Sequence, residues 1–118
     1  ALADAVIAVG GDVAGDARLA RDLEQVNAIG AQVNALVHAR TLEVYERGAL
    51  PALVGGDHST PFGALRAAAE RHPGLGVLHF DAHADLRVAY EGFAWSHASI
   101  MDNVTRHIDG VARIVQVG

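Results

Sequence analysis

The sequence predicts an α/β domain with parallel strands, and three observations support that fold class. Short apolar runs typical of buried strands recur along the chain, and the clearest is residues 76–80. Apolar residues spaced three and four positions apart fill the stretches between these runs, as expected for amphipathic helices. Two of the runs, residues 50–54 and 76–80, enclose such a stretch. Strand, helix and strand in that order form a right-handed crossover between parallel strands.

The first part of the chain is predicted to contain one strand and one long helix. Residues 5–9 are apolar and precede two glycines, which indicates a buried strand followed by a turn. An apolar stripe then extends over residues 17–47 and predicts a helix that Gly48 ends. Asp16 suits the cap at the start of that helix. Gly30 costs about 1 kcal/mol relative to Ala inside a helix, so it indicates either close packing or a break between two helices.

Strands and helices are predicted to alternate in the rest of the chain. Residues 50–54 form the second predicted strand. Thr60 suits the N-cap of the next helix and Pro61 its first position, and Pro73 ends it. The remaining predicted elements are a strand at residues 76–80, an irregular loop at 86–95, a helix at 100–108 and a last strand at 111–117. We interpret His79, within the strand at 76–80, as a core histidine whose hydrogen bonds are satisfied.

Length and composition exclude several classes of protein. The 118 residues are enough for one small domain and too few for two. A net charge of −5 argues against a nucleic-acid partner. The chain has no Cys, and its nine basic residues are all Arg, which excludes thiolate metal sites and lysine Schiff-base chemistry. No apolar run is long enough to span a bilayer and the start lacks a basic secretory leader, so we expect a cytoplasmic protein without a membrane partner.

Three potential metal ligands directly follow the predicted strand at residues 76–80. Asp81, His83 and Asp85 occupy alternate positions, and alternate side chains of an extended backbone point to the same face. Two carboxylates and an imidazole that converge at a strand end predict a site for a divalent cation. His58 follows the other strand of the predicted crossover. The carboxyl ends of parallel strands meet at one edge of a sheet, so His58 is expected near the same site.

Three motifs resemble successive signatures of the ureohydrolase family, which comprises arginases, agmatinases and relatives that hydrolyse guanidino groups to urea. They are Gly-Gly-Asp-His-Ser at residues 55–59, Asp-Ala-His-Ala-Asp at 81–85 and Ser-His-Ala-Ser at 96–99. The resemblance implies an arginase-like, three-layer α/β/α fold with a mainly parallel sheet, incomplete in this chain. It also implies two manganese ions (Mn2+) per full-length chain, a small guanidino substrate and a homo-oligomer.

The resemblance also implies a role for each matching residue. His58 and Asp85 would bind the first manganese ion, His83 the second, and Asp81 would bridge both and so take part in catalysis. His97 matches the family histidine that shuttles protons near the substrate. The family completes its metal cluster with a later Asp-x-Asp motif, which the sequence lacks. We therefore expect residues 1–118 to be the N-terminal part of a single ureohydrolase domain that is inactive on its own.

The substrate and two other interpretations stay open at this stage. Residues 86–95 are apolar and aromatic with Arg87 as their only cation, which favours agmatine, the product being putrescine of polyamine metabolism. Guanidinobutyrate and arginine are the other candidate substrates. A catalytically incompetent fragment or binding module of the same fold is one alternative. Another two-metal hydrolase, a deacetylase or a phosphoesterase, is the second.

Overall fold

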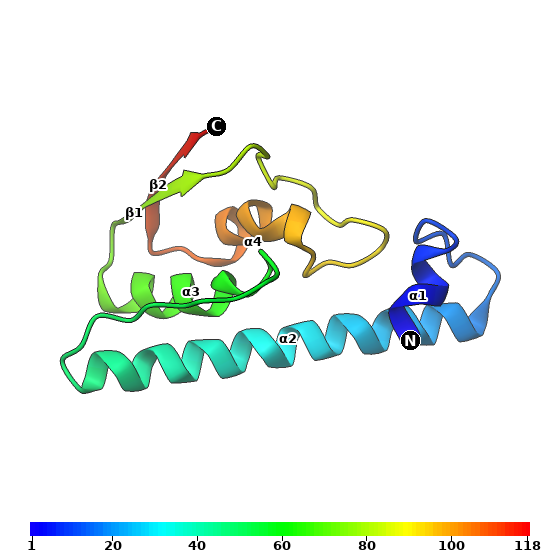
Figure 1. Cartoon of the computed structure of the whole chain (residues 1–118), viewed down its shortest axis with the longest axis horizontal. Coiled ribbons are helices and arrows are strands. Elements are labelled where there is room, and N and C mark those ends of the chain that lie inside the picture. The colour runs from blue at the N-terminus through cyan, green and yellow to red at the C-terminus, as the bar shows by residue number, and fades with distance from the viewer.

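The computed structural model describes residues 1–118 as four α-helices, a short 3₁₀ helix and two strands. The long helix α2 extends along one side of the molecule, and helices α3 and α4 lie between it and the two strands (Figure 1). The elements are α1 (Leu2–Ile7), α2 (Ala17–Glu46), α3 (Pro61–Arg71), β1 (Leu75–Phe80), η1 (His97–Ser99), α4 (Ile100–His107) and β2 (Val111–Val117). None of these helices combines the length and the hydropathy needed to cross a membrane.

The two strands form a parallel sheet. The sequence predicts parallel strands, but it predicts the crossover between residues 50–54 and 76–80 rather than between β1 and β2. β1 pairs with β2, and the connection between them contains α4. The main core packs between α3, α4 and one side of this sheet. Its buried residues are Phe62, Ala69, Ile100, Met101, Val104 and Ile108, with Leu75, Val111 and Ile114 of the strands packed against them. Helices therefore cover one side of the sheet, which makes the chain a partial α/β structure.

Helix α2 is one continuous helix, so Gly30 marks close packing rather than a break. A Cβ atom at Gly30 would lie 2.9 Å from the Cβ atom of Trp95, so any side chain there would force Trp95 or the helix to shift. Asp16 caps the helix as predicted, because its side chain accepts hydrogen bonds from the backbone N–H groups of Arg18 and Leu19. Gly48 follows the C-cap with a φ of +72°, a conformation that glycine adopts readily.

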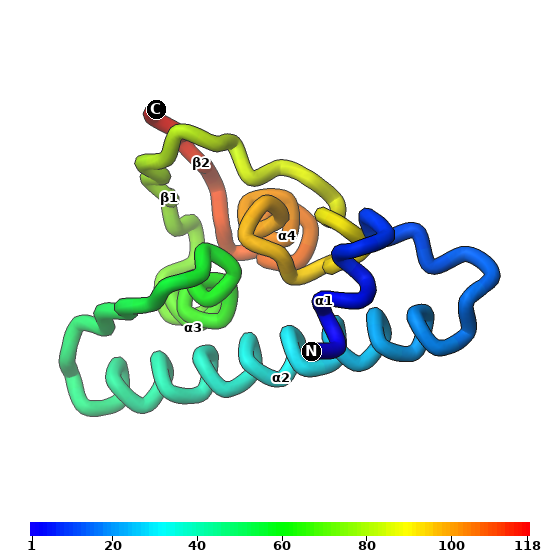
Figure 2. The backbone as a smooth tube through the Cα atoms, turned by 45° about the vertical axis from the view of Figure 1, so that its right-hand side comes forward, coloured from blue at the N-terminus to red at the C-terminus, as the bar shows by residue number.

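The prediction of a strand at residues 5–9 is wrong, because most of this segment belongs to helix α1. The helix packs on the N-terminal part of α2 (Figure 2). Val6 of this helix is fully buried. Ala3 and Ala5 lie within this helix and Ala8 directly follows it, and alanine has the highest helix propensity. A buried strand also needs neighbouring strands for its backbone hydrogen bonds, and none lies beside residues 5–9.

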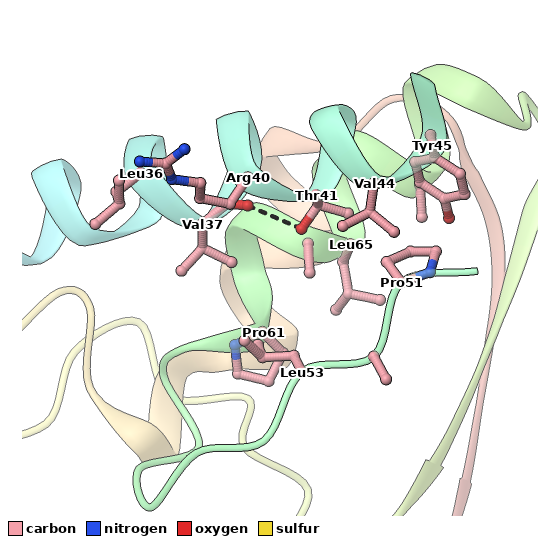
Figure 3. Close-up of a pocket in the computed structure, with 13 residues that line it drawn as sticks. Leu36, Val37, Arg40, Thr41, Val44, Tyr45, Pro51, Leu53, Pro61 and Leu65 are labelled. Atoms are coloured by element: carbon pink, nitrogen blue, oxygen red, sulfur yellow. Dashed lines mark hydrogen bonds between the residues drawn. The ribbon is translucent and has the colours of Figure 1, made fainter. Parts of the chain in front are cut away.

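The prediction of a strand at residues 50–54 is also wrong. The segment is irregular, and Leu50 and Val54 are 92% and 96% exposed. Pro51 has no N–H group to donate, and no strand lies beside the segment to pair with it. In Figure 3 the segment lies opposite α2, and Pro51 and Leu53 line an apolar cavity of about 530 Å³ together with Leu65 of α3. The expected pairing of residues 50–54 with 76–80 therefore does not occur within this chain.

The predictions for the later elements are confirmed. Helix α3 begins at Pro61, α4 and β2 occupy the expected ranges, and the segment before Trp95 is an irregular loop with one isolated bridge between Tyr90 and Phe93. Thr60 precedes α3 without capping it through its side chain. Its hydroxyl donates instead to the backbone oxygen of Asp57, which closes the turn that carries His58.

Candidate metal centre

The loop at residues 81–85 leaves the end of β1 and is tethered to two other elements. The backbone N–H of Asp81 donates to the carbonyl oxygen of Val117 at the end of β2, at 3.1 Å. The carbonyl oxygen of Asp85 accepts from the N–H groups of Met101 and Asp102 in the first turn of α4, at 3.0 and 3.2 Å. Free N–H groups at the start of a helix are natural partners for such an oxygen. The sheet and α4 together fix both ends of the loop.

Four side chains converge beside this loop. The ligand atoms of His58, His79, Asp81 and Asp85 all lie within 4.8 Å of one another. His58 Nδ1 lies 2.6 Å from Asp85 Oδ2 and 3.3 Å from Asp81 Oδ2. The structure therefore brings the two motifs that contain His58 and Asp81 to one place, although the strand expected before His58 is absent.

The alternation predicted for Asp81, His83 and Asp85 is wrong, because the backbone turns within the loop. Asp85 has a φ of +52°, which is not an extended conformation. The side chain of His83 is 81% exposed, whereas that of Asp85 is 7% exposed. The turn arises locally, since Asp81 Oδ1 accepts from the backbone N–H of His83 at 2.9 Å. Short acidic side chains commonly compete for backbone donors in this way and bend the chain.

The two carboxylate oxygens of Asp81 face different histidines. Oδ2 faces His58, while Oδ1 lies 3.1 Å from His83 Nδ1. Asp81 therefore lies between His58 on one side and the exposed His83 on the other. His83 lies outside the group of four, but it touches that group through Asp81.

Two carboxyl groups near the site have pKa values below the ordinary value. The pKa of Asp81 is lowered chiefly by the hydrogen bond from the backbone N–H of His83, which stabilises the carboxylate. Burial of Asp57 tends to raise its pKa, but hydrogen bonds from Ser59 outweigh that effect, and the pKa of Asp57 is also lowered. Both side chains are thus carboxylates at neutral pH. Asp57 accepts from the backbone N–H of Ser59 and so stabilises the turn before α3.

His97 lies in η1 and lines a cavity of about 630 Å³ together with His83 and Asp85. Tyr90 of the irregular loop also lines this cavity, and its ring meets the His97 ring edge-on at 5.5 Å between centroids. The guanidinium carbon of Arg87 lies 5.3 Å from the centre of the Tyr90 ring. The third motif therefore shares a cavity with the second, and the contact between Tyr90 and His97 is one that the sequence did not indicate.

His79 is buried as predicted, but its hydrogen bonds are only partly satisfied. Gln116 of β2 donates to its Nδ1 atom at 2.8 Å, whereas Nε2 is buried and has no hydrogen-bond partner. The His79 ring stacks on the ring of His58 with 5.1 Å between centroids. His79 shares the parity of Asp81 in the sequence, which allowed a place behind the metal, and the structure puts it both in the core and beside the other ligand atoms.

The donor set fits a divalent cation that prefers oxygen and imidazole ligands. Asp81 and Asp85 bring two carboxylates into close contact, and no Arg side chain forms an ion pair with either of them. The only partners of these two carboxylates among ionisable side chains are histidines. Carboxylates and imidazoles without thiolates suit manganese and similar hard or intermediate ions.

Comparison with known proteins identifies the family of the chain. The sequence model of the arginase family matches residues 2–118. The chain is 41% identical over 56 residues to agmatinase of Bacillus subtilis (strain 168), which covers 48% of the chain and 19% of that relative. It is 40% identical over 75 residues to arginase of Bacillus caldovelox (64% and 23%) and 39% identical over 67 residues to proclavaminate amidinohydrolase of Streptomyces clavuligerus (56% and 21%). No solved structure matches the chain significantly. The matched part spans about a fifth of the length of these relatives. The family model, in contrast, matches nearly the whole of this sequence, and the chain therefore belongs to the arginase family.

Proposed function

We propose that residues 1–118 are the N-terminal part of a manganese-dependent amidinohydrolase that releases urea from a guanidino compound. One observation supports this most strongly: in a chain of the arginase family, Asp81 stands between His58 and His83, with one carboxylate oxygen facing each. The relatives named agmatinase, arginase and proclavaminate amidinohydrolase add support at the level of the reaction class. We expect the full-length protein to be a cytoplasmic homo-oligomer.

Four side chains of this chain would hold the metal ions. His58 and Asp85, which already touch at 2.6 Å, would bind one ion, and the exposed His83 would bind a second. Asp81 would bind both through its two oxygens, and its lowered pKa keeps it ionised for that role. Two bound divalent ions lower the pKa of water and so supply a nucleophile near neutral pH. The later carboxylates that complete such a site in the family would come from outside these residues.

The cavity beside His83 favours a substrate without a carboxylate. Its lining contains the aromatic ring of Tyr90 and a single guanidinium, that of Arg87, which lies against this ring. Arginine would need donors for its α-carboxylate, whereas agmatine has no such group to satisfy. We therefore propose agmatine as the substrate and putrescine as the amine product.

His97 would serve as the acid that protonates the departing amine. It lines the same cavity as His83 and Asp85, so a substrate held beside the metal ligands would lie within its reach. An imidazole suits this role because it is the side chain whose charge changes most readily near neutral pH. The edge-on contact with Tyr90 holds the ring of His97 in the cavity.

Metal content and urea release in the full-length protein test the proposal. We expect two manganese ions per chain, urea from agmatine, and slower release from arginine and guanidinobutyrate. A His83→Ala variant should lose manganese and activity, while His72→Ala, which changes the exposed C-cap residue of α3, should keep both. Unchanged manganese content in the His83→Ala variant would refute the ligand assignment. Hydrolysis of a phosphoester or an acetylamide instead of a guanidino group would identify another two-metal hydrolase.

A further inference from the structure

His79 is a buried polar side chain that points at two of the proposed metal ligands. It is 6% exposed, and its Nε2 atom lies 3.7 Å from Asp81 Oδ2 and 4.0 Å from Asp85 Oδ2. This nitrogen has no hydrogen-bond partner. Buried polar atoms nearly always have one, so an exception beside a candidate metal centre indicates a functional role.

The tautomer of His79 follows from its neighbour on β2. Gln116 is paired with His79 in the register of the parallel sheet. The Gln116 Nε2 atom lies 2.7 Å from the carbonyl oxygen of Ala84 and 2.8 Å from His79 Nδ1. A carbonyl oxygen can only accept, so the atom that faces Ala84 must be the NH₂ group of the amide. The same NH₂ group faces Nδ1, which must therefore accept, and the proton of a neutral His79 is on Nε2.

A proton on Nε2 decides between two roles for His79. An imidazole nitrogen that carries a proton has no lone pair for a metal ion, so this tautomer argues against His79 as a ligand. The N–H group can instead face the carboxylates of Asp81 and Asp85 and stabilise their negative charge. Carboxylates that bind metals are commonly held by hydrogen bonds from neighbouring groups, and those groups tune the affinity of the site.

We propose that His79 is a positioning residue of the metal centre, which Gln116 holds in the Nε2–H tautomer so that its N–H group faces the carboxylates of Asp81 and Asp85 at 3.7 and 4.0 Å. Gln116 also holds the loop itself, because its second hydrogen bond goes to Ala84 between the two aspartates. One side chain of β2 therefore sets both the tautomer of His79 and the position of the loop. The inference rests on the proposed metal site.

The tautomer can be measured directly in the full-length protein without metal. In ¹⁵N NMR spectra of histidine-labelled protein, the two ring nitrogens of a neutral imidazole have clearly different shifts. The His79 signals are assigned by their loss in the His79→Gln variant. We expect the proton on Nε2. A proton on Nδ1 would overturn the proposal, because Nε2 would then be free to bind an ion itself.

Variants of His79 test its effect on metal binding. His79→Phe keeps a ring but removes both nitrogens, and we expect manganese affinity, measured by calorimetry, to fall by about 10–100-fold. His79→Gln can place an amide N–H near the position of Nε2, so it should recover much of the loss. Val115→Thr is the matched control, since Val115 is next to Gln116 and pairs with Leu78 rather than with His79. A folded His79→Phe variant with unchanged manganese affinity would overturn the proposal.

Gln116 gives a second test that leaves His79 in place. Gln116→Glu replaces the NH₂ donor by an acceptor, which should move the His79 proton to Nδ1 and lower manganese affinity. If the His79→Phe variant does not fold, this variant and the NMR measurement decide the question. Unchanged tautomer and affinity in Gln116→Glu would contradict the proposal. Absence of manganese binding and of urea release in the unaltered protein would refute the proposed function. The NMR measurement of the His79 tautomer needs no metal, so it would still test the tautomer by itself.

Discussion

Asp85 is the residue of the candidate site with the most constrained backbone. Its φ of +52° lies in the left-handed region, which costs about 1–3 kcal/mol for most residues other than glycine. Asp and Asn tolerate this region better than other residues do. The surroundings hold the conformation, because the carbonyl oxygen of Asp85 accepts from the first turn of α4 and its side chain is buried against His58.

An Asp85→Asn variant should separate the effect of the backbone conformation at this position from the effect of the carboxylate charge. Asn adopts the same φ and has nearly the same shape, so the fold should be kept. The loss of a carboxylate ligand should lower manganese affinity by more than the roughly 10–100-fold typical for an outer partner. Calorimetry measures the affinity, and circular dichroism confirms the fold. A variant that binds manganese as tightly as the unaltered protein would show that Asp85 is not a ligand.

A His97→Ala variant tests the proposed acid. General acid–base groups contribute about 10²–10⁴-fold in rate, so turnover should fall on that scale. Manganese content should be unchanged, because His97, unlike His83 and His58, forms no ion pair with Asp81 or Asp85. Initial rates of urea release and elemental analysis measure the two quantities. Loss of both manganese ions, or full activity, would be inconsistent with the proton-transfer role.

At the scale of elements, the contact between α2 and α3 depends on one glycine. A Cβ atom at Gly63 would clash with the backbone oxygen of Asn34 and lie 2.7 Å from the backbone nitrogen of His38. Backbone atoms of a helix cannot move aside as a flexible side chain can. The absence of a side chain at Gly63 therefore lets α3 approach α2, and α3 begins three residues after His58.

A Gly63→Ala variant should lower the free energy of unfolding by about 1–3 kcal/mol, as expected for an overpacked interior. The gain of helix propensity from Gly to Ala, about 1 kcal/mol, opposes the loss without cancelling it. Gly76→Ala in β1 is the control, since nothing lies within 4 Å of a Cβ atom there. Denaturant unfolding of both variants measures the difference. Equal stability of the two would argue against close backbone packing at Gly63.

The start of α2 gives a prediction for the pH dependence of stability. Hydrogen bonds from the backbone N–H groups of Leu19 and Arg18 lower the pKa of Asp16 in the folded state below its ordinary value. A lowered folded pKa adds stability that is fully present above the unfolded value and is lost as the pH falls through the folded value. Asp16→Ala should thus lower the melting temperature at neutral pH and have less effect below pH about 3. Asp109→Ala, a change at an exposed residue, is the control. A fall in melting temperature for Asp16→Ala that is as large at acidic as at neutral pH would contradict the role of the Asp16 carboxylate as the cap of α2.

At the scale of the whole molecule, the chain is less compact than a self-contained domain. Its radius of gyration is 15.4 Å, whereas about 13.5 Å is expected for a compact domain of this length. Only 16 of 118 residues are buried. Apolar side chains of both strands face solvent on the side of the sheet away from α3 and α4, and Phe80 is 71% exposed. A two-stranded sheet with such a surface gains little stability by itself.

Residues 1–118 expressed alone should therefore release no urea from agmatine or arginine when manganese is supplied. The cluster contains one carboxylate that could bridge two ions, Asp81, so repulsion between two dications would be poorly compensated. We expect binding of one metal ion at most, and association of the chain through its exposed strands. Urea assays, calorimetry and light scattering measure these outcomes, with Bacillus subtilis agmatinase as the positive control. Turnover comparable with that enzyme would show that the site is complete within this chain.

The sequence by itself determined the features that depend on local chemistry. The long helix α2 followed from its apolar stripe, the start of α3 from Pro61, and β1 and β2 from short apolar runs with turns beside them. The motifs around His58, Asp81 and His97 identified the family and the candidate site, because ligand types and their spacing are written directly in the chain.

Tertiary structure alone decided which apolar segments form strands and how the residues of the candidate site are arranged. Residues 5–9 and 50–54 have the composition of strands, but a strand forms only where another strand takes up its backbone hydrogen bonds, and none is present beside either segment. The turn at Asp85 and the exposure of His83 depend on hydrogen bonds to Asp81 and to α4 that no periodicity reveals. The role of His79 depends on Gln116, which lies 37 positions away in sequence and becomes its neighbour only through the register of the sheet.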